Sequence, residues 1–206
     1  MGGNVPSRAG TPAQTLVAAA ERLESLGRVV ARSSLYSTEP VGYADQPRFV
    51  NAVVALETEF PPRALLEGLL ALEKEFGRDR STGIPNGPRS LDLDIVLYGE
   101  QSISEPGLEI PHPRLAERAF VLIPLNEIAP QIRDSRSGRT VGQLLHNLRS
   151  QDKSDTDAVV PIESGNWRAG VDGDVLRPSQ SQRANARNSN CSRQSRSRAP
   201  WRDNSG

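Results

Sequence analysis

The sequence has little of several residue types, and each shortage argues against a class of protein. A single cysteine, Cys191, in 206 residues excludes an internal disulfide and any multi-cysteine zinc site. Aromatic residues make up 4% and hydrophobic residues 36%, too little for a chain of this length to fold throughout. Because no apolar run of about 18 residues occurs, neither a membrane helix nor a signal peptide is expected. We expect a soluble protein of the reducing cytoplasm.

Net charge is also lacking, since 25 basic residues balance 25 acidic ones. This balance argues against a globally polycationic nucleic-acid binder, although a local basic patch stays possible. From Arg177 to Gly206, seven arginines face only one acid, Asp203. Beyond residue 150 the chain is rich in Ser, Asn, Gln and Arg and poor in large aliphatic residues. We predict a folded domain over residues 1–149 and a disordered tail over 150–206, either a solvated extension, which is favoured, or an arm for RNA or a membrane surface.

Local patterns predict alternating helices and strands within the domain. Helices are expected after Thr11, after Pro61, near Pro113 and after Thr140, and strands over 28–38, 49–58 and 90–97. The order helix, strand, strand, helix, strand is most of a split β-α-β arrangement. A strand before the first helix is missing, and Met1-Gly2-Gly3-Asn4 is typical of the turn after such a strand.

Two aspartates in the third predicted strand carry the chemical argument. Asp92 and Asp94 are two residues apart, so a strand directs both to one face at a spacing of about 6.8 Å. Two converging carboxylates repel one another unless a cation lies between them. Mg²⁺ suits such a pair, because it completes its octahedron with water and phosphate oxygens. Taken alone, the pair is more typical of an exposed, solvated strand face.

Basic residues around this strand favour a phosphate site. Arg78, Arg80 and Arg89 lie in the Gly- and Pro-containing segment just before it. Arginines of a flexible loop can make bidentate contacts to a polyphosphate. Phosphoryl transfer needs little more than such positioning and charge neutralisation. Pairing of each arginine with a nearby acid is the alternative interpretation.

A second polar cluster follows the strand. His112 lies between Pro111 and Pro113, which stiffen the turn and give the imidazole a defined direction. Arg118 and Phe120 come shortly after it. A lone histidine is more often structural, so His112 gains a role only from its neighbours.

Six motifs in a fixed order now resemble one enzyme family. They are Arg89-Ser90-Leu91-Asp92-Leu93-Asp94-Ile95 after Gly87-Pro88, Ser34-Leu35-Tyr36-Ser37-Thr38-Glu39-Pro40-Val41-Gly42, Asp45-Gln46-Pro47-Arg48-Phe49-Val50-Asn51-Ala52, Gly77-Arg78-Asp79-Arg80, Ile110-Pro111-His112-Pro113-Arg114 and Arg118-Ala119-Phe120-Val121-Leu122. Together they resemble the 6-hydroxymethyl-7,8-dihydropterin pyrophosphokinases of folate biosynthesis over residues 2–132. So many ordered motifs are far more specific than any one of them.

The resemblance implies a fold and a reaction. The fold is an α+β, ferredoxin-like sandwich with a mainly antiparallel sheet and helices on one face. The reaction is transfer of the β,γ-pyrophosphoryl group of ATP to the hydroxymethyl oxygen of the pterin, with release of AMP. It implies two Mg²⁺ ions, ATP and a small pterin as the only partners, no nucleic acid or membrane, and a monomer.

The resemblance also implies roles for individual residues. Asp92 and Asp94 would hold the two Mg²⁺ ions. Phosphate contacts are expected from Arg78, Arg80, Arg89, His112 and Arg118, and adenine contacts from the backbone near Ile95. The pterin site is expected to comprise Thr38, Pro40, Val41, Gly42 and Asn51 at the edge of the ring and Phe49 and Phe120 on its two faces. Either aspartate could accept the hydroxyl proton.

The match is incomplete in three places. The family has an apolar first strand, whereas this sequence begins at the Gly-Gly-Asn segment. Asn86 stands where the family can have a tryptophan, and the residues after Gln151 have no counterpart. Two alternatives to the enzyme therefore stay open: a truncated, inactive remnant, and a non-catalytic RNA-binding ferredoxin-like module.

Overall fold

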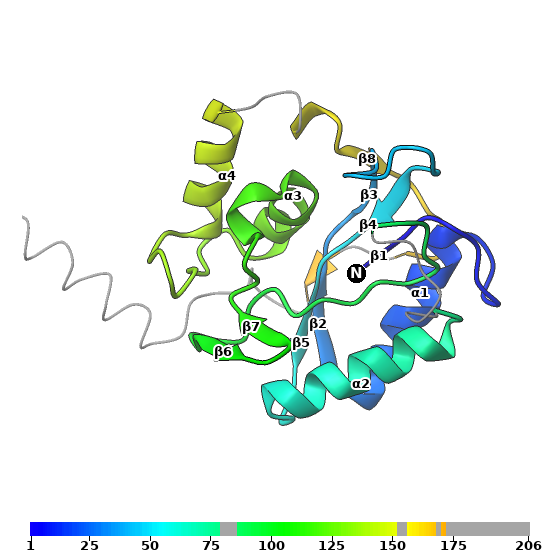
Figure 1. The fold of residues 1–206 in the computed structure, drawn as a ribbon, viewed down its shortest axis with the longest axis horizontal. Coiled ribbons are helices and arrows are strands. Elements are labelled where there is room, and N and C mark those ends of the chain that lie inside the picture. The colour runs from blue at the N-terminus through cyan, green and yellow to red at the C-terminus, as the bar shows by residue number, and fades with distance from the viewer. Residues whose placement is uncertain (79–85, 152–155, 168–169, 172–206) are drawn as a thin grey trace, which may run out of the picture.

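The first two helices begin where the sequence predicts. In the computed structural model, which describes residues 1–78, 86–151, 156–167 and 170–171, α1 (Pro12–Arg22) follows a capping box (Figure 1). The Thr11 hydroxyl accepts from the Gln14 amide at 3.3 Å, and the Gln14 side chain accepts from the Thr11 amide at 2.8 Å. A short 3₁₀ turn, η1 (Leu23–Ser25), continues α1. α2 (Pro62–Glu75) begins with a proline at its first position, as predicted.

Each of the first two predicted strands is divided in two. Residues 28–38 form β2 (Arg28–Arg32) and β3 (Leu35–Thr38), and residues 49–58 form β4 (Phe49–Asn51) and β5 (Val54–Glu57). The break lies at Ser33, whose hydroxyl accepts from the Val53 amide at 2.9 Å and donates to the Ser34 carbonyl at 2.8 Å. This side chain takes the place of part of the backbone ladder, so both strands bend at one level.

The described strands form antiparallel sheets in the orders β1-β4-β3-β8, β5-β2-β9 and β6-β7. β1 (Gly2–Gly3) corrects one prediction, because these residues are a paired strand and not a turn. Gly2 and Gly3 pair with Asn51 and Val50 of β4. A Cβ on Gly2 would lie 2.2 Å from Asn51 Oδ1, and one on Gly3 would lie 2.3 Å from the Ser90 carbonyl oxygen. Only glycine permits this close approach.

The strand predicted over residues 90–97 is present only as an extended segment. Gly2 and Asp92 exchange backbone hydrogen bonds of 2.9 and 2.7 Å. Within the described residues, this isolated bridge is all the strand pairing that the segment makes. The predicted alternation still holds at its start, where Leu91 and Leu93 are 0% and 4% exposed. The side chains of Asp92 and Asp94 point to the face opposite that of Leu91 and Leu93.

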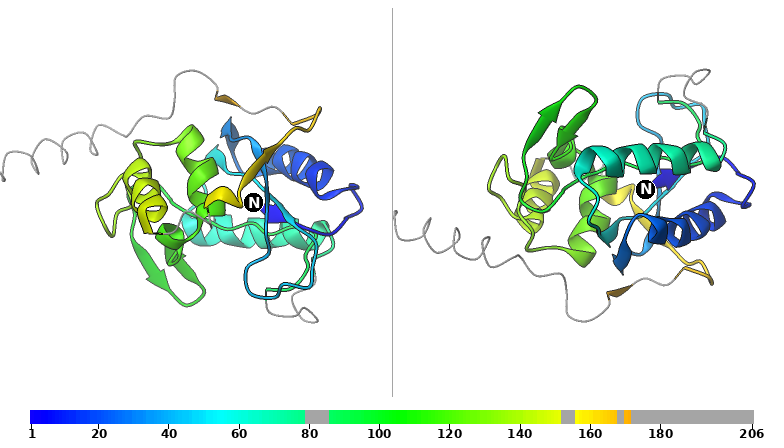
Figure 2. Two further views of the ribbon diagram at one scale, coloured as in Figure 1. Left: turned by 90° about the horizontal axis from the view of Figure 1, so that it is seen from above. Right: turned by 90° about the horizontal axis from the view of Figure 1, so that it is seen from below.

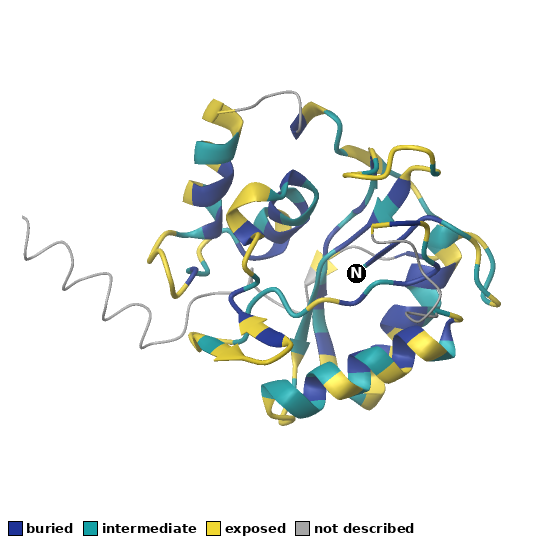
Figure 3. Ribbon diagram, viewed as in Figure 1, coloured by how far each residue is buried: buried dark blue, intermediate teal, exposed yellow. Residues whose placement is uncertain are grey.

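Two hydrophobic clusters cover opposite faces of the strands. One packs α1 and α2 against Leu35, Leu91 and Leu93. The other packs α3 (Ala119–Ile128) and α4 (Val141–Gln151) against Ala31. Buried positions of α1 and α2 face the strands in Figure 3, and Figure 2 shows α3 and α4 together, apart from α1. The α+β class is therefore confirmed, with helices against both faces of the strands. α1, α2 and α4 begin after Thr11, Pro61 and Thr140 as predicted, whereas α3 begins at Ala119, later than the helix expected near Pro113.

The remaining elements complete the molecule. The hairpin of β6 (Ile103–Glu105) and β7 (Leu108–Ile110) and the 3₁₀ turn η2 (Leu115–Glu117) precede α3. α4 follows Thr140, whose hydroxyl accepts from the Gln143 amide at 3.2 Å, as its predicted cap. Among the described helices, none is both long and apolar enough to cross a membrane.

Part of the segment assigned to the tail packs on the domain. β8 (Val160–Ile162) pairs with β3, and β9 (Gly170–Val171) pairs with β2. Trp167 is 9% exposed, and its indole N–H donates to the Ser33 carbonyl at 2.7 Å. We call the described residues 156–167 and 170–171 the C-terminal strap. Residues 150–151 of the predicted tail end α4, and its residues 152–155, 168–169 and 172–206 lie outside the described residues.

Candidate active site

A cavity of about 500 Å³ gathers most of the predicted site residues at the ends of several elements. Its walls come from the segments after β3, around Asp92 and between β7 and α3, and from β4. The predicted residues in its lining are Thr38, Val41, Gly42, Phe49, Asn51, Arg78, Arg89, Asp92, Asp94, His112, Arg118 and Phe120. The sequence motifs thus converge on one place.

Three predicted residues are not part of this lining. Pro40 lies just outside it, and Ile95 lines a neighbouring apolar cavity instead. Arg80 lies outside the described residues. Their proposed contacts with substrate and nucleotide stay predictions.

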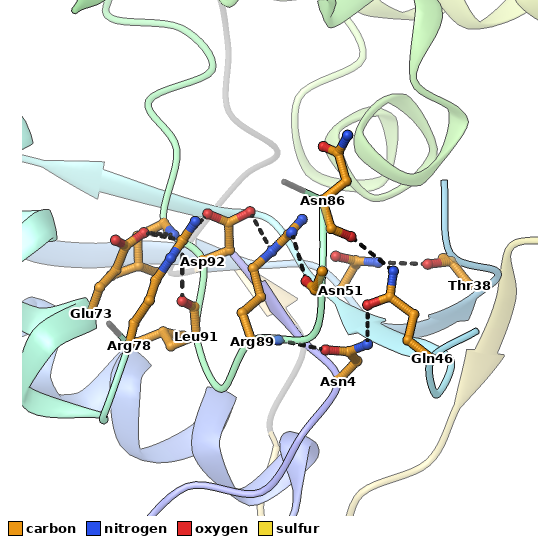
Figure 4. Close-up of polar contacts among 12 residues, drawn as sticks. Asn4, Thr38, Gln46, Asn51, Glu73, Arg78, Asn86, Arg89, Leu91 and Asp92 are labelled. Carbon is orange, nitrogen blue, oxygen red and sulfur yellow. Dashed lines mark hydrogen bonds and ion pairs between the residues drawn. The ribbon is translucent and has the colours of Figure 1, made fainter. Parts of the chain in front are cut away.

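Asp92 is the charge centre of the site. The guanidinium of Arg78 donates to Asp92 Oδ1, and Arg89 Nε lies 3.0 Å from Asp92 Oδ2, so two arginines flank one carboxylate (Figure 4). Burial alone would raise the pKa of the Asp92 carboxyl, but Arg89 and Arg78 outweigh it and hold this pKa below its usual range. Asp94, in contrast, is exposed and lines the same cavity.

A buried glutamate supports this centre. Glu73 is 1% exposed, on the inner face of α2. Its Oε1 accepts from Arg78 Nη1 at 2.7 Å and from the Leu93 amide at 2.8 Å. Glu73 therefore fixes both an arginine and the backbone between the two aspartates. The sequence analysis missed this residue, although a charged side chain four residues after Leu69 in an apolar helix stripe was a usable signal.

Two aromatic rings stand in the cavity wall, each beside a guanidinium. Arg89 Cζ lies 4.8 Å from the centre of the Phe49 ring, and Arg118 Cζ lies 5.5 Å from that of Phe120. Phe49 comes from β4 and Phe120 from the first turn of α3. Rings from separate elements that face one cavity can hold a flat heterocycle by its faces.

Amide side chains set the polar edge of the cavity and tie its loops together. Asn51 Nδ2 donates to Thr38 Oγ1 at 2.7 Å. Asn4, which is buried, donates to Gln46 Oε1 at 2.9 Å and accepts from the Arg89 amide at 2.9 Å. Gln46 Nε2 in turn donates to the Asn86 carbonyl at 2.9 Å (Figure 4). These bonds connect the segment before β4 with the segment before Asp92.

His112 is held as a hydrogen-bond acceptor. Its Nδ1 accepts from the Arg114 amide at 3.1 Å, and Arg118 Nη1 lies 3.4 Å from its Nε2. Burial and the positive charge of Arg118 lower the pKa of His112. Arg114 also lines the cavity. The sequence analysis gave it no role, although it lies in the motif that holds His112.

The two aspartates fit a magnesium site. Within the part of the chain that the structure describes, no group of three or more His, Cys, Asp or Glu residues could hold a metal. A pair of carboxylates in one cavity of about 500 Å³ still matches Mg²⁺, which takes one or two protein carboxylates and fills its other positions with water and phosphate oxygens. Such a site would be completed by the nucleotide.

Comparison with known proteins identifies the family. Residues 1–130 match 7,8-dihydro-6-hydroxymethylpterin-pyrophosphokinase (HPPK). The chain belongs to the HPPK family. Among its relatives is the 2-amino-4-hydroxy-6-hydroxymethyldihydropteridine pyrophosphokinase of Pseudomonas aeruginosa, 48% identical over 136 residues, which are 65% of this chain and 82% of that protein.

Two further HPPK relatives bear on domain organisation. The enzyme of the same name from Methylorubrum extorquens is 43% identical over 144 residues, 69% of this chain and 89% of that protein. A folate synthesis bifunctional protein of Arabidopsis thaliana is 49% identical over 100 residues, 48% of this chain but 20% of that protein. The HPPK match ends at residue 130, so it does not extend to α4 or the C-terminal strap.

Proposed function

We propose that this HPPK-family chain transfers the pyrophosphoryl group of ATP to 6-hydroxymethyl-7,8-dihydropterin, a step of folate biosynthesis, and releases AMP. One observation carries this proposal. Asp92 and Asp94 share a single cavity with several cationic side chains, two aromatic rings and the Asn51 amide. These are the groups that a triphosphate and a flat heterocycle with a polar edge each require.

In the proposed reaction, the pterin hydroxymethyl oxygen attacks the β-phosphorus of ATP. A new oxygen–phosphorus bond forms, the bond from the β-phosphorus to the oxygen that bridges to the α-phosphorus breaks, and that oxygen leaves with AMP. The hydroxyl proton is lost to solvent or to one of the two aspartates. The net result is the pterin diphosphate and AMP.

The chain's own residues act by positioning and charge compensation. Phe49 and Phe120 hold the pterin ring by its faces, and Asn51 reads its polar edge. Arg78, Arg89 and Arg118 stabilise the negative charge that develops on the phosphate oxygens. Asp92 and Asp94 would hold two Mg²⁺ ions, which, when bound, supply further neutralisation of that charge.

We also propose that the chain acts as a monomer in the cytoplasm. The predicted site residues that line the cavity bring the phosphate-binding and ring-binding groups together within a single chain, which supports this proposal. A single cysteine fits a reducing compartment.

The nucleotide product tests the proposed function. Protein, ATP, Mg²⁺ and the hydroxymethyl-dihydropterin should yield AMP and the pterin diphosphate in equal amounts, measured by anion-exchange chromatography. Asp94→Ala should lose turnover by about 100-fold or more while its circular-dichroism spectrum and melting temperature stay close to those of the parent. ADP as the product, or full activity in Asp94→Ala, would contradict the assignment.

A further inference from the structure

Arg48 holds three segments of the chain together just behind the candidate active site. Its Nε donates to Ser37 Oγ at 2.8 Å, its Nη2 donates to the Ala158 carbonyl at 3.1 Å, and its Nη1 donates to the Glu39 carboxylate. Ser37 lies in β3, Glu39 in the segment that follows β3, and Ala158 in the C-terminal strap. Arg48 itself comes directly before β4. We call Arg48 and these three partners the Arg48 clamp.

The Arg48 clamp contacts the back of the cavity wall. Phe49 and Thr38 line the cavity and pair with each other across β4 and β3. Arg48 and Ser37, their chain neighbours, are not part of the lining. Because successive side chains of a strand point to opposite faces, the guanidinium and the Ser37 hydroxyl lie on the face that is turned away from the cavity. Glu39, the carboxylate of the clamp, does line the cavity. The clamp therefore joins the two strands of the ring-binding wall from outside and holds one residue of the lining itself.

The C-terminal strap lies along the outer side of β3 (Figure 1). β8 runs antiparallel to β3, with Val160 opposite Ser37. The same register, continued for two residues, places Ala158 opposite Glu39. The C-terminal strap thus follows the chain to the point where β3 leads into the cavity-lining segment that includes Gly42. The HPPK match ends at residue 130, so this support of the site comes from beyond the matched part of the chain.

The direction of the backbone groups shows how β8 holds β3. Gly2 exchanges its hydrogen bonds with Asp92, so Asn51, which lies opposite Gly2, turns its own N–H and C=O to β3. Its partner in β3 is the residue just before Ser37. Alternation along β3 then turns Ser37 to β8, where the N–H of Val160 faces the Ser37 carbonyl. The C-terminal strap therefore bonds to the backbone of the same residue whose hydroxyl accepts from the Arg48 clamp.

The exposure of the clamp argues against a role in overall stability. The side chains of Arg48 and Glu39 are 42% and 59% exposed. Ion pairs with this much exposure add little to the free energy of unfolding. What the clamp fixes is the position of the strand ends that carry Thr38 and Phe49.

We infer that Arg48 is a positioning residue of the pterin site and that the C-terminal strap is part of the same arrangement, an inference that rests on the proposed function. The Arg48 clamp holds Phe49 at the level of Thr38, whose hydroxyl accepts from Asn51 Nδ2 at 2.7 Å. The ring-binding wall and the polar edge are then in place before the pterin arrives, which lowers the entropic cost of binding. The phosphate-binding arginines make none of these contacts, so the clamp serves the pterin and not ATP.

Arg48→Gln in the full chain tests this inference. The amide cannot reach all three partners, so the KM for the hydroxymethyl-dihydropterin should rise by about fivefold or more. The KM for ATP should stay within about twofold and the melting temperature within about 2 °C, because the clamp is exposed and remote from the phosphate site. Initial rates of AMP release at varied concentrations of each substrate give both KM values.

Arg63→Gln is the matched control. The Arg63 side chain is 40% exposed, and its guanidinium also donates to one carboxylate, that of Glu105 at 2.9 Å, and to one backbone carbonyl, that of Pro106 at 3.0 Å. It is not part of the cavity lining. Its loss should change neither KM.

Two further substitutions separate geometry from charge and test the C-terminal strap. Arg48→Lys keeps the charge, but one ammonium group cannot bond to all three partners, so most of the rise in the pterin KM should remain. Val160→Pro removes the N–H that faces Ser37 and should raise the pterin KM by about threefold or more, whereas Val160→Ala keeps this N–H and should not. Val160 is exposed, so neither change disturbs the core.

Hydrogen exchange of the β8 amides supplies a readout that needs no turnover. It should become faster by about fivefold in Arg48→Gln, because the clamp no longer holds the C-terminal strap. Unchanged exchange, an equal rise in both KM values, full recovery in Arg48→Lys, or an unchanged pterin KM in Val160→Pro would each overturn the inference. A parent chain that forms no AMP would contradict the proposed function, whereas an active parent whose KM values survive Arg48→Gln would contradict the role of the Arg48 clamp alone.

Discussion

At the scale of single residues, the candidate site depends on one carboxylate shared by two guanidinium groups. Asp92 pairs with Arg78 and Arg89, and Glu73 pairs with Arg78 as well, so two carboxylates balance two guanidinium groups. The arginines are therefore held close to where phosphates would bind before any nucleotide arrives. Charged groups that are already in position need little rearrangement during a reaction.

Replacement of Asp92 tests this arrangement. Asp92→Asn should lower kcat by about 100-fold or more, since the amide cannot balance two cations or bind a divalent ion. The exposed Asp157→Asn, the same chemical change in the C-terminal strap, is the control and should leave kcat within about twofold. Because the folded pKa of Asp92 is lowered, its contribution to stability is present above about pH 3.8 and is lost as the pH falls through the folded pKa. Equal kcat in the two variants would contradict the role of Asp92.

His112 gives a prediction about pH. Its pKa in the folded chain lies below the ordinary 6.5, so the unfolded chain takes up this proton first as the pH falls. The stability that neutral His112 provides is complete above pH 6.5 and is lost below it. The free energy of unfolding, measured in urea at pH 7.5 and 5.5, should therefore fall less between these two pH values for His112→Gln than for the parent. The nuclear magnetic resonance signal of His112 should titrate at higher pH once ATP is bound, because phosphates stabilise the protonated ring. An identical loss in both proteins would contradict the prediction.

Much of the site's chemistry could be predicted from the sequence, because motif residues are adjacent in the chain. Asp92, Asp94 and Arg89 belong to one run, and alternation along that run gave the common direction of the two aspartates. Glu73 could not be assigned in the same way, since its partners Arg78 and Leu93 meet it only after α2 packs. The Asn4–Gln46 link was equally hidden, because it joins segments about 40 residues apart.

At the scale of elements, β1 lies between two backbones at distances that exclude any side chain. Gly3→Ala would place a methyl group against the Ser90 carbonyl, which cannot move without shifting the backbone that leads to Asp92. It should lower the free energy of unfolding by about 2–3 kcal/mol in a urea titration. Gly165→Ala is the control, because nothing lies within 4 Å of its added Cβ. If Gly3→Ala lowers the free energy of unfolding no more than Gly165→Ala does, β1 is not tightly held.

The elements show where sequence patterns stop being sufficient. Caps at Thr11 and Thr140 fix helix starts through contacts within four residues, so both starts were predictable. The division of the strands at Ser33 depends on a bond to Val53, which no local pattern contains. The incomplete pairing of residues 90–97 likewise depends on what lies beside them, and the alternation of Leu91 and Leu93 alone could not reveal it.

At the scale of the whole molecule, the C-terminal strap returns to the domain after α4 and covers β3 and β2. Composition placed it in the tail because the chain beyond residue 150 as a whole is rich in Ser, Asn, Gln and Arg and poor in large aliphatic residues. The strap nevertheless docks through the short strands β8 and β9 and through Trp167, whose ring packs in the α1–α2 cluster and lies 5.6 Å from Arg32 Cζ.

Substitution of Trp167 tests the docking of the strap. Trp167→Phe keeps most of the apolar surface but removes the donor to the Ser33 carbonyl, and should destabilise the chain by about 1 kcal/mol. Trp167→Ala should cost about 3 kcal/mol. Trp201→Phe, at a position outside the described residues, is the control. Denaturant titrations followed by circular dichroism would measure all three, and no difference between Trp167→Ala and the control would show that the strap adds nothing to stability.

The proline at the centre of β8 has a consequence for aggregation. Pro161 pairs opposite Tyr36 and has no N–H, so β8 closes one side of its sheet with a strand that offers a poor template to another molecule. Deletion of the strap would uncover β3 and with it a run of unpaired donors. Shortened forms of this protein should therefore form fibrils or precipitate at concentrations at which the full chain stays dispersed.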